Sequence, residues 1–240
     1  MIEYIEGTVF NSPAKTIVNT VNCAGVMGAG IALEFKLRYP EMYEEYTKMC
    51  ENKQIKIGIP KIHEYCDERW IMNFPTKGHW RFPSKIQWIE SALKYFAENY
   101  EKRDMKSIAF PKLGTHNGGL EWEEVKVLME KYLGNLNIPV YICLDEMKEA
   151  EGAEKEMVDS INGIDIMSEY KEIGISKKAA EKIENRLPIS RFWHISNIQG
   201  ITSKSYESLF NYFYKRSSEY IKYNSSDKEI CVTTEQLSLF

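Results

Sequence analysis

Residues 18–36 read VNTVNCAGVMGAGIALEFK, in which an apolar strand runs into a glycine-rich loop and then directly into a helix. Gly25, Gly28 and Gly30 can adopt positive φ angles and let a ligand approach the backbone closely. The free N–H groups at the start of the following helix attract anionic oxygens. This order of elements predicts either a phosphate-binding loop or a tight turn between strand and helix, and on its own it favours neither.

Two asparagines, Asn19 and Asn22, lie at the carboxyl end of this strand. In an open α/β sheet, ligands bind at that edge. The spacing Gly25-x-x-Gly28-x-Gly30 differs from the dinucleotide fingerprint, no acidic residue follows at the expected distance, and no Walker lysine is present. The loop therefore predicts an anion site of a different kind.

A second loop of the same type occupies residues 107–122, SIAFPKLGTHNGGLEW. Here too an apolar strand leads into a glycine-rich turn, and the pattern predicts a helix over residues 121–133. Two such loops at one edge of a sheet predict a site for a diphosphate.

Composition limits the class of protein. A chain of 240 residues can form one large core and a smaller second unit, and a net charge of −4 gives no general attraction to nucleic acid, although a local basic patch remains open. The five cysteines form no Cys-x-x-Cys pair and the four histidines lack metal-ligand spacing, so we expect reduced thiols and no metal. Without a signal-peptide pattern or a long apolar run, the sequence predicts a cytoplasmic protein with no membrane partner.

Apolar and amphipathic segments alternate over residues 1–147, which predicts an α/β domain. We expect Ser84 to cap the third helix of this domain. The expected strands are residues 1–9, 16–21, 55–62, 70–74, 107–110 and 140–144, and the expected helices are residues 30–38, 41–51, 84–100 and 121–133.

The composition changes after residue 147. Residues 148–160 are strongly charged and predict a linker or the start of a helix. Residues 161–224 predict a helical region of unknown role, whose last helix, expected over residues 203–223, carries many aromatic side chains. Those aromatics favour a packed core or docking face over a platform for stacking bases. Residues 225–240 are expected to form a flexible tail.

Between the two glycine loops, the strand at residues 70–74 continues into PTKGHWR at residues 75–81, which should reach the same edge of the sheet. Lys77 in this segment could bind phosphate, act as a nucleophile if its pKa is lowered, or stabilise developing charge, and phosphate contact is the commoner role. His116 in the second loop could contact phosphate or simply face solvent. Neither loop contains Asp or Glu, so a hydrolase here would depend on positioning, polarisation and Lys77.

Taken together, these segments resemble a known family. Residues 18–32, NFPTKGHWR at residues 73–81 and LGTHNGGLEW at residues 113–122 resemble macrodomains, and more narrowly the DNA ADP-ribosyl glycohydrolase antitoxins of the DarT/DarG type, which are related to terminal ADP-ribose glycohydrolase. The likeness covers residues 1–145. It implies a three-layer α/β/α macrodomain with a mixed six-stranded sheet that binds ADP-ribose as ligand or product, without a cofactor or metal.

The resemblance also implies roles for particular residues. It assigns catalysis to Lys77, which would attack the anomeric carbon of the distal ribose or stabilise charge there, and to Asn22, which would hydrogen-bond that ribose. The further ligand-binding residues that it implies are Thr8, Val9, Asn19, Gly25, Val26, Met27, Gly28, Ala29, Gly30, Ile31, Thr76, Gly114, Thr115, His116, Asn117, Gly118, Gly119 and Leu120.

This sequence departs from the family pattern at several positions. Thr8 stands where most macrodomains have an aspartate for the adenine, and Thr115 and His116 stand where relatives often have Cys-Gly. Gly118 replaces the catalytic aspartate of terminal ADP-ribose glycohydrolase. This last difference favours release of ADP-ribose from a DNA base over release from protein glutamate.

The resemblance therefore implies an enzyme that removes ADP-ribose from DNA bases, with ADP-ribosylated DNA and a DarT-like transferase toxin as partners. The alternatives are a non-catalytic ADP-ribose reader and a hydrolase of protein-linked or small ADP-ribose derivatives. The last five residues, from Gln236 to Phe240, resemble the peptide with which bacterial proteins bind the sliding clamp. They are equally compatible with an apolar tail that packs on the chain's own helices.

Overall fold

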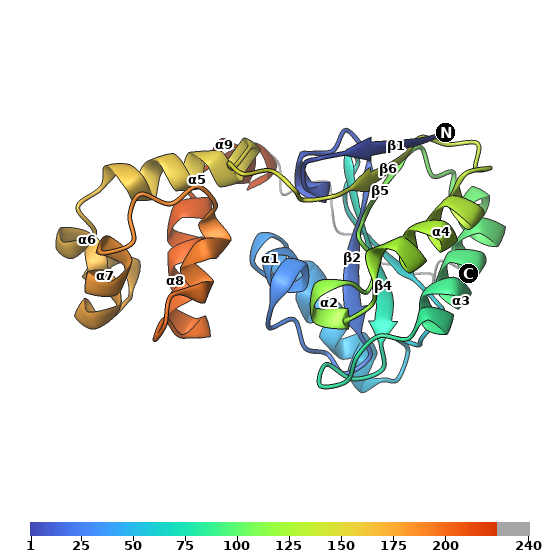
Figure 1. Cartoon of the computed structure of the whole chain (residues 1–240), viewed down its shortest axis with the longest axis horizontal. Helices are drawn as coiled ribbons and strands as arrows, with labels where there is room; N and C mark the ends of the chain where they lie inside the picture. Colours follow the sequence, from blue (N-terminus) through green and yellow to red (C-terminus); the bar gives the residue numbers. More distant parts are fainter. Residues whose placement is uncertain (225–240) are drawn as a thin grey trace. The chain divides into compact units, whose positions relative to one another are not determined.

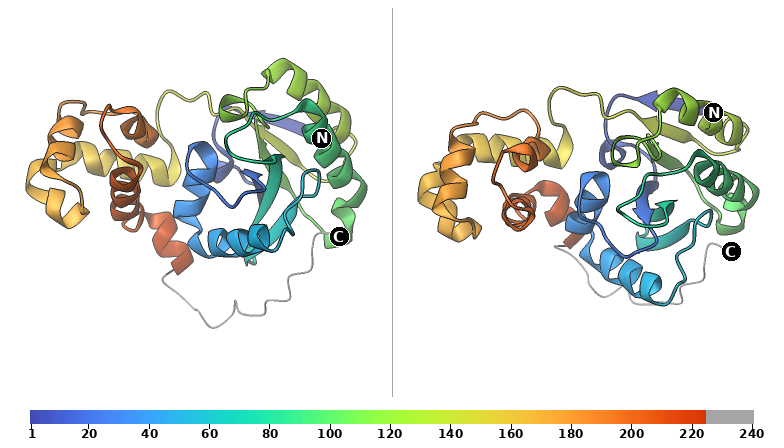
Figure 2. Two further views of the ribbon diagram at one scale, coloured as in Figure 1. Left: turned by 90° about the horizontal axis from the view of Figure 1, so that it is seen from below. Right: turned by 60° about the horizontal axis from the view of Figure 1, so that its bottom comes forward.

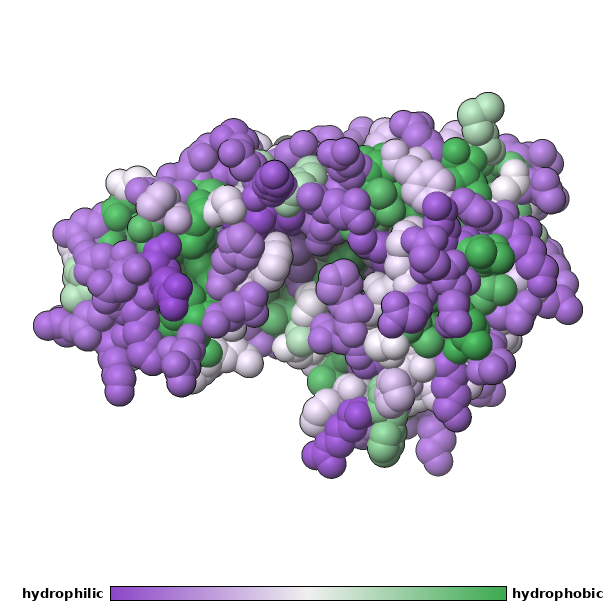
Figure 3. Space-filling view, viewed as in Figure 1, coloured by the Kyte–Doolittle hydropathy of each residue, from purple (hydrophilic) through white to green (hydrophobic). Residues whose placement is uncertain are grey.

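The computed structural model describes residues 1–224, and these divide into two compact units, residues 1–146 and residues 147–224 (Figure 1). Each unit has its own helices and its own buried apolar residues. The face drawn in Figure 3 is mostly hydrophilic, with smaller apolar patches on both units. The amino-terminal unit contains the segments expected to form the site.

The sheet of the first unit has six strands in the order β1-β6-β5-β2-β4-β3. Every neighbouring pair is parallel except β3 with β4, so the sheet is mixed, and this part of the predicted fold is confirmed. The strands span Ile2–Ile5 (β1), Thr16–Asn22 (β2), Lys61–Cys66 (β3), Arg69–Lys77 (β4), Ile108–Pro111 (β5) and Val140–Cys143 (β6).

Two apolar clusters pack on opposite faces of this sheet and produce three layers. On one face Ile17, Ile71 and Ala109 pack with the helices α1 (Gly30–Arg38) and α2 (Pro40–Glu51). On the other face alternate residues of the same strands pack with α3 (Ile86–Asn99) and α4 (Trp122–Leu133). The blue pair α1 and α2 and the green pair α3 and α4 can be followed in Figure 2. The central strands are apolar without alternation because both of their faces are buried.

The structure corrects two predicted strands. The strand expected at residues 55–62 begins only at Lys61, because Gly58 has a φ of +81° and Pro60 has no N–H to donate to a neighbouring strand. The strand expected at residues 1–9 ends at Ile5, and a short 3-10 turn, η1, spans Val9–Asn11. Both differences shorten strands at their ends and leave the order of the elements as predicted.

The second unit is helical, and its described elements are α5 (Gly152–Gly163), α6 (Ile166–Ile173), α7 (Lys177–Glu184), the 3-10 turn η4 (Phe192–Asn197), α8 (Ser203–Tyr214) and α9 (Ser218–Asn224). Of the two alternatives for residues 148–160, a helix start is present from Gly152, because apolar residues recur at helical spacing and are buried. The single helix expected over residues 203–223 is divided: the chain turns after Tyr214, where the Ser217 hydroxyl donates to the Tyr214 carbonyl oxygen at 2.7 Å.

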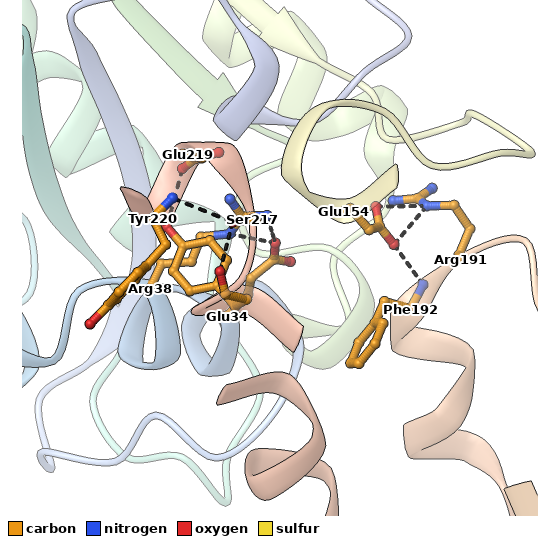
Figure 4. Close-up of polar contacts among 9 residues, drawn as sticks. Glu34, Arg38, Glu154, Arg191, Phe192, Ser217, Glu219 and Tyr220 are labelled. Carbon is orange, nitrogen blue, oxygen red and sulfur yellow. Dashed lines mark hydrogen bonds and ion pairs between the residues drawn. The ribbon is translucent and has the colours of Figure 1, made fainter. Parts of the chain in front are cut away.

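A buried ion pair and an aromatic cluster hold the second unit together. The Nε of Arg191 lies 3.1 and 3.0 Å from the two carboxylate oxygens of Glu154, and the backbone N–H of Phe192 donates to the same carboxylate at 2.9 Å (Figure 4). The Phe192 ring contacts Tyr206, Phe210 and Phe213. These aromatic residues of α8 are buried, so they form packed core, as expected.

Candidate functional site

Three segments meet at the carboxyl edge of the central strands. Loop 1, residues 23–29, joins β2 to α1, and loop 2, residues 112–121, joins β5 to α4. The end of β4 lies next to β2 in the sheet, and there Lys77 is paired in register with Asn22 of β2. The backbone N–H of Cys23 donates to the Lys77 carbonyl oxygen at 3.0 Å. The first residue of loop 1 is therefore bonded directly to Lys77.

Asn22 determines the shape of loop 1. Its side-chain oxygen accepts hydrogen bonds from the N–H groups of Ala24 at 2.9 Å and Val26 at 3.4 Å, and its side-chain nitrogen donates to the Val26 carbonyl oxygen at 2.6 Å. Tyr46 of α2 supports this residue from below, because its hydroxyl donates to the Asn22 carbonyl oxygen at 2.6 Å. Asn22 thus orders the backbone that would meet the ligand.

Sequence reasoning did not identify Tyr46. Burial raises the pKa of the Tyr46 phenol, so the hydroxyl keeps its proton and remains a donor. In the sequence this residue looks like one more apolar position on the buried face of an amphipathic helix. No local signal connects it with Asn22, which lies 24 residues earlier.

Loops 1 and 2 touch each other at Gly30, the first residue of α1. Gly30 has a φ of +57°, and a Cβ atom at this position would lie 2.8 Å from the side-chain nitrogen of Asn117 in loop 2. The positive φ favours glycine here, and a side chain at this position would also require the Asn117 side chain to move. Ala29, the residue at the N-cap position of α1, makes no side-chain capping hydrogen bond to the first N–H groups of this helix.

Loop 2 folds back on itself through a short 3-10 turn, η3 (His116–Gly118). The Leu120 N–H donates to the Gly114 carbonyl oxygen at 3.1 Å, which closes the loop at its base. His116, Asn117 and Gly119 are exposed, whereas Gly114 and Gly118 are buried. The tip of the loop can therefore meet a ligand while its base supports it.

Ser84 is hydrogen-bonded to loop 2 and does not cap α3. Its backbone N–H donates to the Gly118 carbonyl oxygen at 2.9 Å, and α3 begins at Ile86 with Lys85 at the cap position. A Cβ on Gly118 would lie 2.7 Å from the Ser84 hydroxyl, which has no hydrogen-bond partner within the described residues. The expected capping role was wrong because a contact distant in sequence fixes Ser84 instead.

Lys77 connects β4 with loop 2. Its Nζ donates to the carbonyl oxygen of Asn117, and burial lowers the pKa of Lys77 below the usual lysine range. Lys77 is half-buried, so its amine keeps access to the edge of the sheet. The amine, the loop that holds it and the loop bonded to its backbone are therefore parts of one site.

The surroundings of Lys77 are poor in acid. Residues 7–33, 69–89 and 105–120, which supply the three segments, contain no Asp or Glu, although the chain has 35 acidic residues. The first acidic residue after loop 1 is Glu34, and its carboxylate lies 2.6 Å from a guanidinium nitrogen of Arg38 one turn further along α1 (Figure 4). An anionic ligand therefore meets little local repulsion at this edge.

Several expected ligand residues lie below the surface. Asn19, Val9 and Met27 are only 0%, 1% and 1% exposed, and Val9 and Met27 belong to the apolar cluster beside α1 and α2. The Asn19 side-chain nitrogen donates to the Asn73 side-chain oxygen at 3.0 Å within the sheet. Thr76 is also buried, with its hydroxyl 3.4 Å from the Val21 carbonyl oxygen. These four buried residues pack inside the domain and support the backbone near the edge of the sheet.

Other residues that were expected to bind the ligand are at least partly exposed. Thr8 is half-buried just before η1. Val26, Gly28 and Ala29 of loop 1 and Gly30 at the start of α1 are exposed, whereas Gly25, Ile31, Thr115 and Leu120 are half-buried. Within residues 1–224, no group of three His, Cys, Asp or Glu side chains is arranged to hold a metal ion. In the same range no helix is long and apolar enough to cross a membrane.

This architecture and this edge define a macrodomain: a mixed six-stranded sheet between two pairs of helices, with two glycine loops at one end. Residues 18–129 match the Macro domain family. The chain belongs to the macrodomain family, in agreement with the resemblance of its motifs.

Two relatives narrow the comparison. A DNA ADP-ribosyl glycohydrolase of Thermus aquaticus is 41% identical over 136 residues, which are 55% of this chain and 38% of the relative. A DNA ADP-ribosyl transferase-DNA ADP-ribosyl glycohydrolase fusion protein of Thermosipho africanus is 37% identical over 161 residues, which are 60% of this chain and 42% of the relative. The matched part of the chain thus spans less than half the length of either relative.

Solved structures give the same result. The macrodomain of Thermus aquaticus DarG is 39% identical with a TM-score of 0.58, and the match covers 60% of this chain and 98% of that one. Thermosipho africanus DarTG in complex with ADP-ribose is also 39% identical with a TM-score of 0.58, over 60% of this chain and 41% of that one. The similarity thus covers a complete macrodomain and only part of the larger DarTG chain.

Proposed function

We propose that this protein is an ADP-ribosyl glycohydrolase that removes ADP-ribose from modified DNA bases. The observation that carries the proposal is the position of Lys77, whose amine is bonded to loop 2 and whose carbonyl oxygen is bonded to loop 1. Relatives that are 41% and 37% identical carry DNA ADP-ribosyl glycohydrolase in their names, which supports DNA as the carrier. A similar structure in complex with ADP-ribose supports the ligand.

The two loops divide the ligand between them. Loop 1 and the first N–H groups of α1 would hold the distal ribose and one phosphate, and the exposed tip of loop 2 would hold the other phosphate. Asn22 would act on the ribose mainly through the loop backbone that it orders. Thr8 would take part at the adenine end, where a hydroxyl replaces the usual carboxylate.

Lys77 can break the glycosidic bond by either of two routes. As a neutral amine, its Nζ forms a bond to the anomeric carbon while the bond from that carbon to the base nitrogen breaks; the base takes the electron pair and a proton, and water then displaces the lysine. As an ammonium ion, Lys77 stabilises negative charge on the departing base while water attacks the anomeric carbon. The lowered pKa of Lys77 favours the first route.

One observation favours a second function, that of a non-catalytic reader of ADP-ribose. The three segments of the site contain no carboxylate that could activate water, and the Lys77 amine is already bonded to the Asn117 carbonyl oxygen. A site of this kind can bind ADP-ribose without turning it over. A hydrolase of protein-linked or small ADP-ribose derivatives is the remaining alternative.

A panel of substrates separates these functions. The protein is incubated with single-stranded DNA carrying ADP-ribose on thymidine or on guanosine, with ADP-ribosylated protein, and with ADP-ribose 1″-phosphate. We expect release of free ADP-ribose from one of the DNA substrates and much slower release from the others. Tight binding of ADP-ribose with no release from any substrate would select the reader.

The proposal includes partners and a location. The fusion relative joins a transferase to a glycohydrolase, so a DarT-like transferase that modifies the DNA is the expected counterpart. The protein would act in the cytoplasm, where its DNA substrate lies, and would need neither cofactor nor metal. The predicted clamp-binding peptide, Gln236 to Phe240, lies outside the described residues and stays a prediction.

A further inference from the structure

Aromatic side chains are exposed directly after Lys77. Trp80 is 45% exposed and Phe82 is 64% exposed, which is unusual for large apolar side chains. The rings of His79 and Trp80 are stacked with their centroids 5.5 Å apart and an interplanar angle of 26°, and the Phe82 ring lies 5.8 Å from His79. The three rings form one exposed group that neither apolar cluster of the first unit includes.

Two cations accompany these rings. The Arg81 guanidinium lies 4.7 Å from the centre of the Trp80 ring, and the Lys85 amine lies 5.0 Å from the centre of the Trp88 ring. Trp88 in turn lies against the backbone just after Lys77, because a Cβ on Gly78 would be 3.8 Å from its ring. Neither cation has a carboxylate partner in the described part of the chain. Their charges remain available to an anion.

The charge of this segment is opposite to that of the chain. Residues 69–89 contain Arg69, Lys77, Arg81 and Lys85 and no acidic residue, whereas the whole chain has a net charge of −4. Exposed rings combined with unpaired cations are the two features with which proteins hold single-stranded nucleic acid, through base stacking and phosphate contact.

The segment is also close to the reacting centre. Trp80 is three residues after Lys77, and three residues span at most about 11 Å. A strand whose modified nucleotide lies at Lys77 can therefore bring a neighbouring nucleotide within reach of these rings. In a duplex the neighbouring bases are stacked on each other and paired, so the rings can stack only on unpaired bases.

We propose that the 79–85 platform, made of the rings of His79, Trp80 and Phe82 with the cations of Arg81 and Lys85, binds single-stranded DNA next to the modified nucleotide. The platform makes flanking nucleotides part of the substrate and selects single strands over duplex. The inference rests on the proposed function only where it treats the bound DNA as the substrate. Binding of DNA to the platform can be measured without hydrolysis.

The first experiment measures binding of an unmodified, fluorescent single-stranded oligonucleotide by anisotropy at low salt. Trp80→Ala and Phe82→Ala should each weaken binding about tenfold, and Arg81→Gln should weaken it and reduce its salt dependence. Trp193→Ala is the matched control, since Trp193 is 43% exposed and lies in the second unit. Equal binding by wild type and both ring variants, or weakening by the Trp193 change alone, would overturn the proposal.

The second experiment compares two substrates that carry the same ADP-ribosylated base, one in an oligonucleotide and one as a nucleoside. For Trp80→Ala the loss of kcat/KM on the oligonucleotide should exceed the loss on the nucleoside by about tenfold. Equal losses on both would assign these residues to folding or to the ADP-ribose site. If wild type hydrolyses neither substrate but binds the oligonucleotide through the platform, the proposed function fails and the platform stands.

Discussion

At the scale of single residues, the proposed cleavage of the glycosidic bond depends on the amine of Lys77. Lysine is a weak nucleophile at neutral pH because nearly all of it is protonated. Burial lowers the pKa of Lys77, and the bond of its Nζ to the Asn117 carbonyl oxygen fixes where the amine lies. One side chain therefore has both the position and the protonation equilibrium that the first catalytic route requires.

The pH profile of hydrolysis distinguishes the two routes. If the neutral amine attacks, kcat rises with pH and levels off once the pH exceeds the lowered pKa of Lys77, because the deprotonated fraction grows through that range. The half-maximal pH should lie below the ordinary lysine value of about 10.4. The measurement is single-turnover hydrolysis of ADP-ribosylated DNA across pH. A rate that falls over the same range would indicate the ammonium route.

Tyr46 carries a second prediction at this scale. Tyr46→Phe removes the hydrogen bond of 2.6 Å to the buried Asn22 carbonyl oxygen and should lower the free energy of unfolding of the first unit by about 1 kcal/mol. Tyr132→Phe is the control, because its hydroxyl donates at 2.9 Å to Glu90 in a more exposed setting. Urea unfolding of both variants provides the comparison, and equal losses would mean that Tyr46 has no special role beneath loop 1.

At the scale of elements, the junction of loop 1, α1 and loop 2 is the critical feature. Gly30→Ala forces a side chain into a backbone with φ of +57° and places it 2.8 Å from the Asn117 side chain. We expect a loss of about 1–2 kcal/mol in the free energy of unfolding and weaker binding of ADP-ribose.

Gly28→Ala is the matched control within the same loop. A Cβ on Gly28 would make an ordinary contact of 3.7 Å with Val26, and its φ is not in the left-handed region. Its free energy of unfolding should stay within about 0.5 kcal/mol of wild type. Thermal or urea unfolding and calorimetry with ADP-ribose measure both effects. Similar stability of the two alanine variants would refute the close contact between the loops.

The elements also show what a sequence can and cannot predict. The glycine loops and the alternation of strands and helices have local signals, so the mixed sheet, the four flanking helices and the position of both glycine loops at one edge were predicted correctly. Ser84, which supports Gly118, and Glu154, which pairs with Arg191, depend on contacts 34 and 37 residues away in sequence. Such residues look like a helix cap and a solvated charge until the chain is folded.

For the candidate site, too, local sequence signals locate the segments but do not reveal contacts that are distant in sequence. The sequence locates the edge, but it does not tell which side chains at the ends of the strands point outward. Asn19 and Asn22 are three residues apart on β2, yet Asn19 is enclosed by Asn73 and the sheet whereas Asn22 turns toward loop 1. Tyr46 and Ser84 were missed because they support the loops from other elements.

At the scale of the whole molecule, the site belongs to the first unit alone. Both glycine loops, Lys77 and the two apolar clusters lie within residues 1–146. A fragment of residues 1–147 should therefore fold with a single cooperative transition and bind ADP-ribose within about twofold of the full chain. Calorimetry and thermal unfolding test this prediction. A fragment that is unfolded, or that binds ADP-ribose tenfold more weakly, would show that the helical unit completes the site.

Substitution of Lys77 removes the amine to which both catalytic routes assign the cleavage of the glycosidic bond. In single-turnover assays with ADP-ribosylated single-stranded DNA, Lys77→Ala should lower the rate by roughly 10²–10⁴, with the affinity for ADP-ribose reduced only a few-fold. Lys112→Ala is the control at the start of loop 2, since the Lys112 amine is held by Glu146 at 2.8 Å, and this variant should hydrolyse the substrate at nearly the wild-type rate. Hydrolysis by Lys77→Ala within twofold of wild type, with ADP-ribose still bound, would contradict the account.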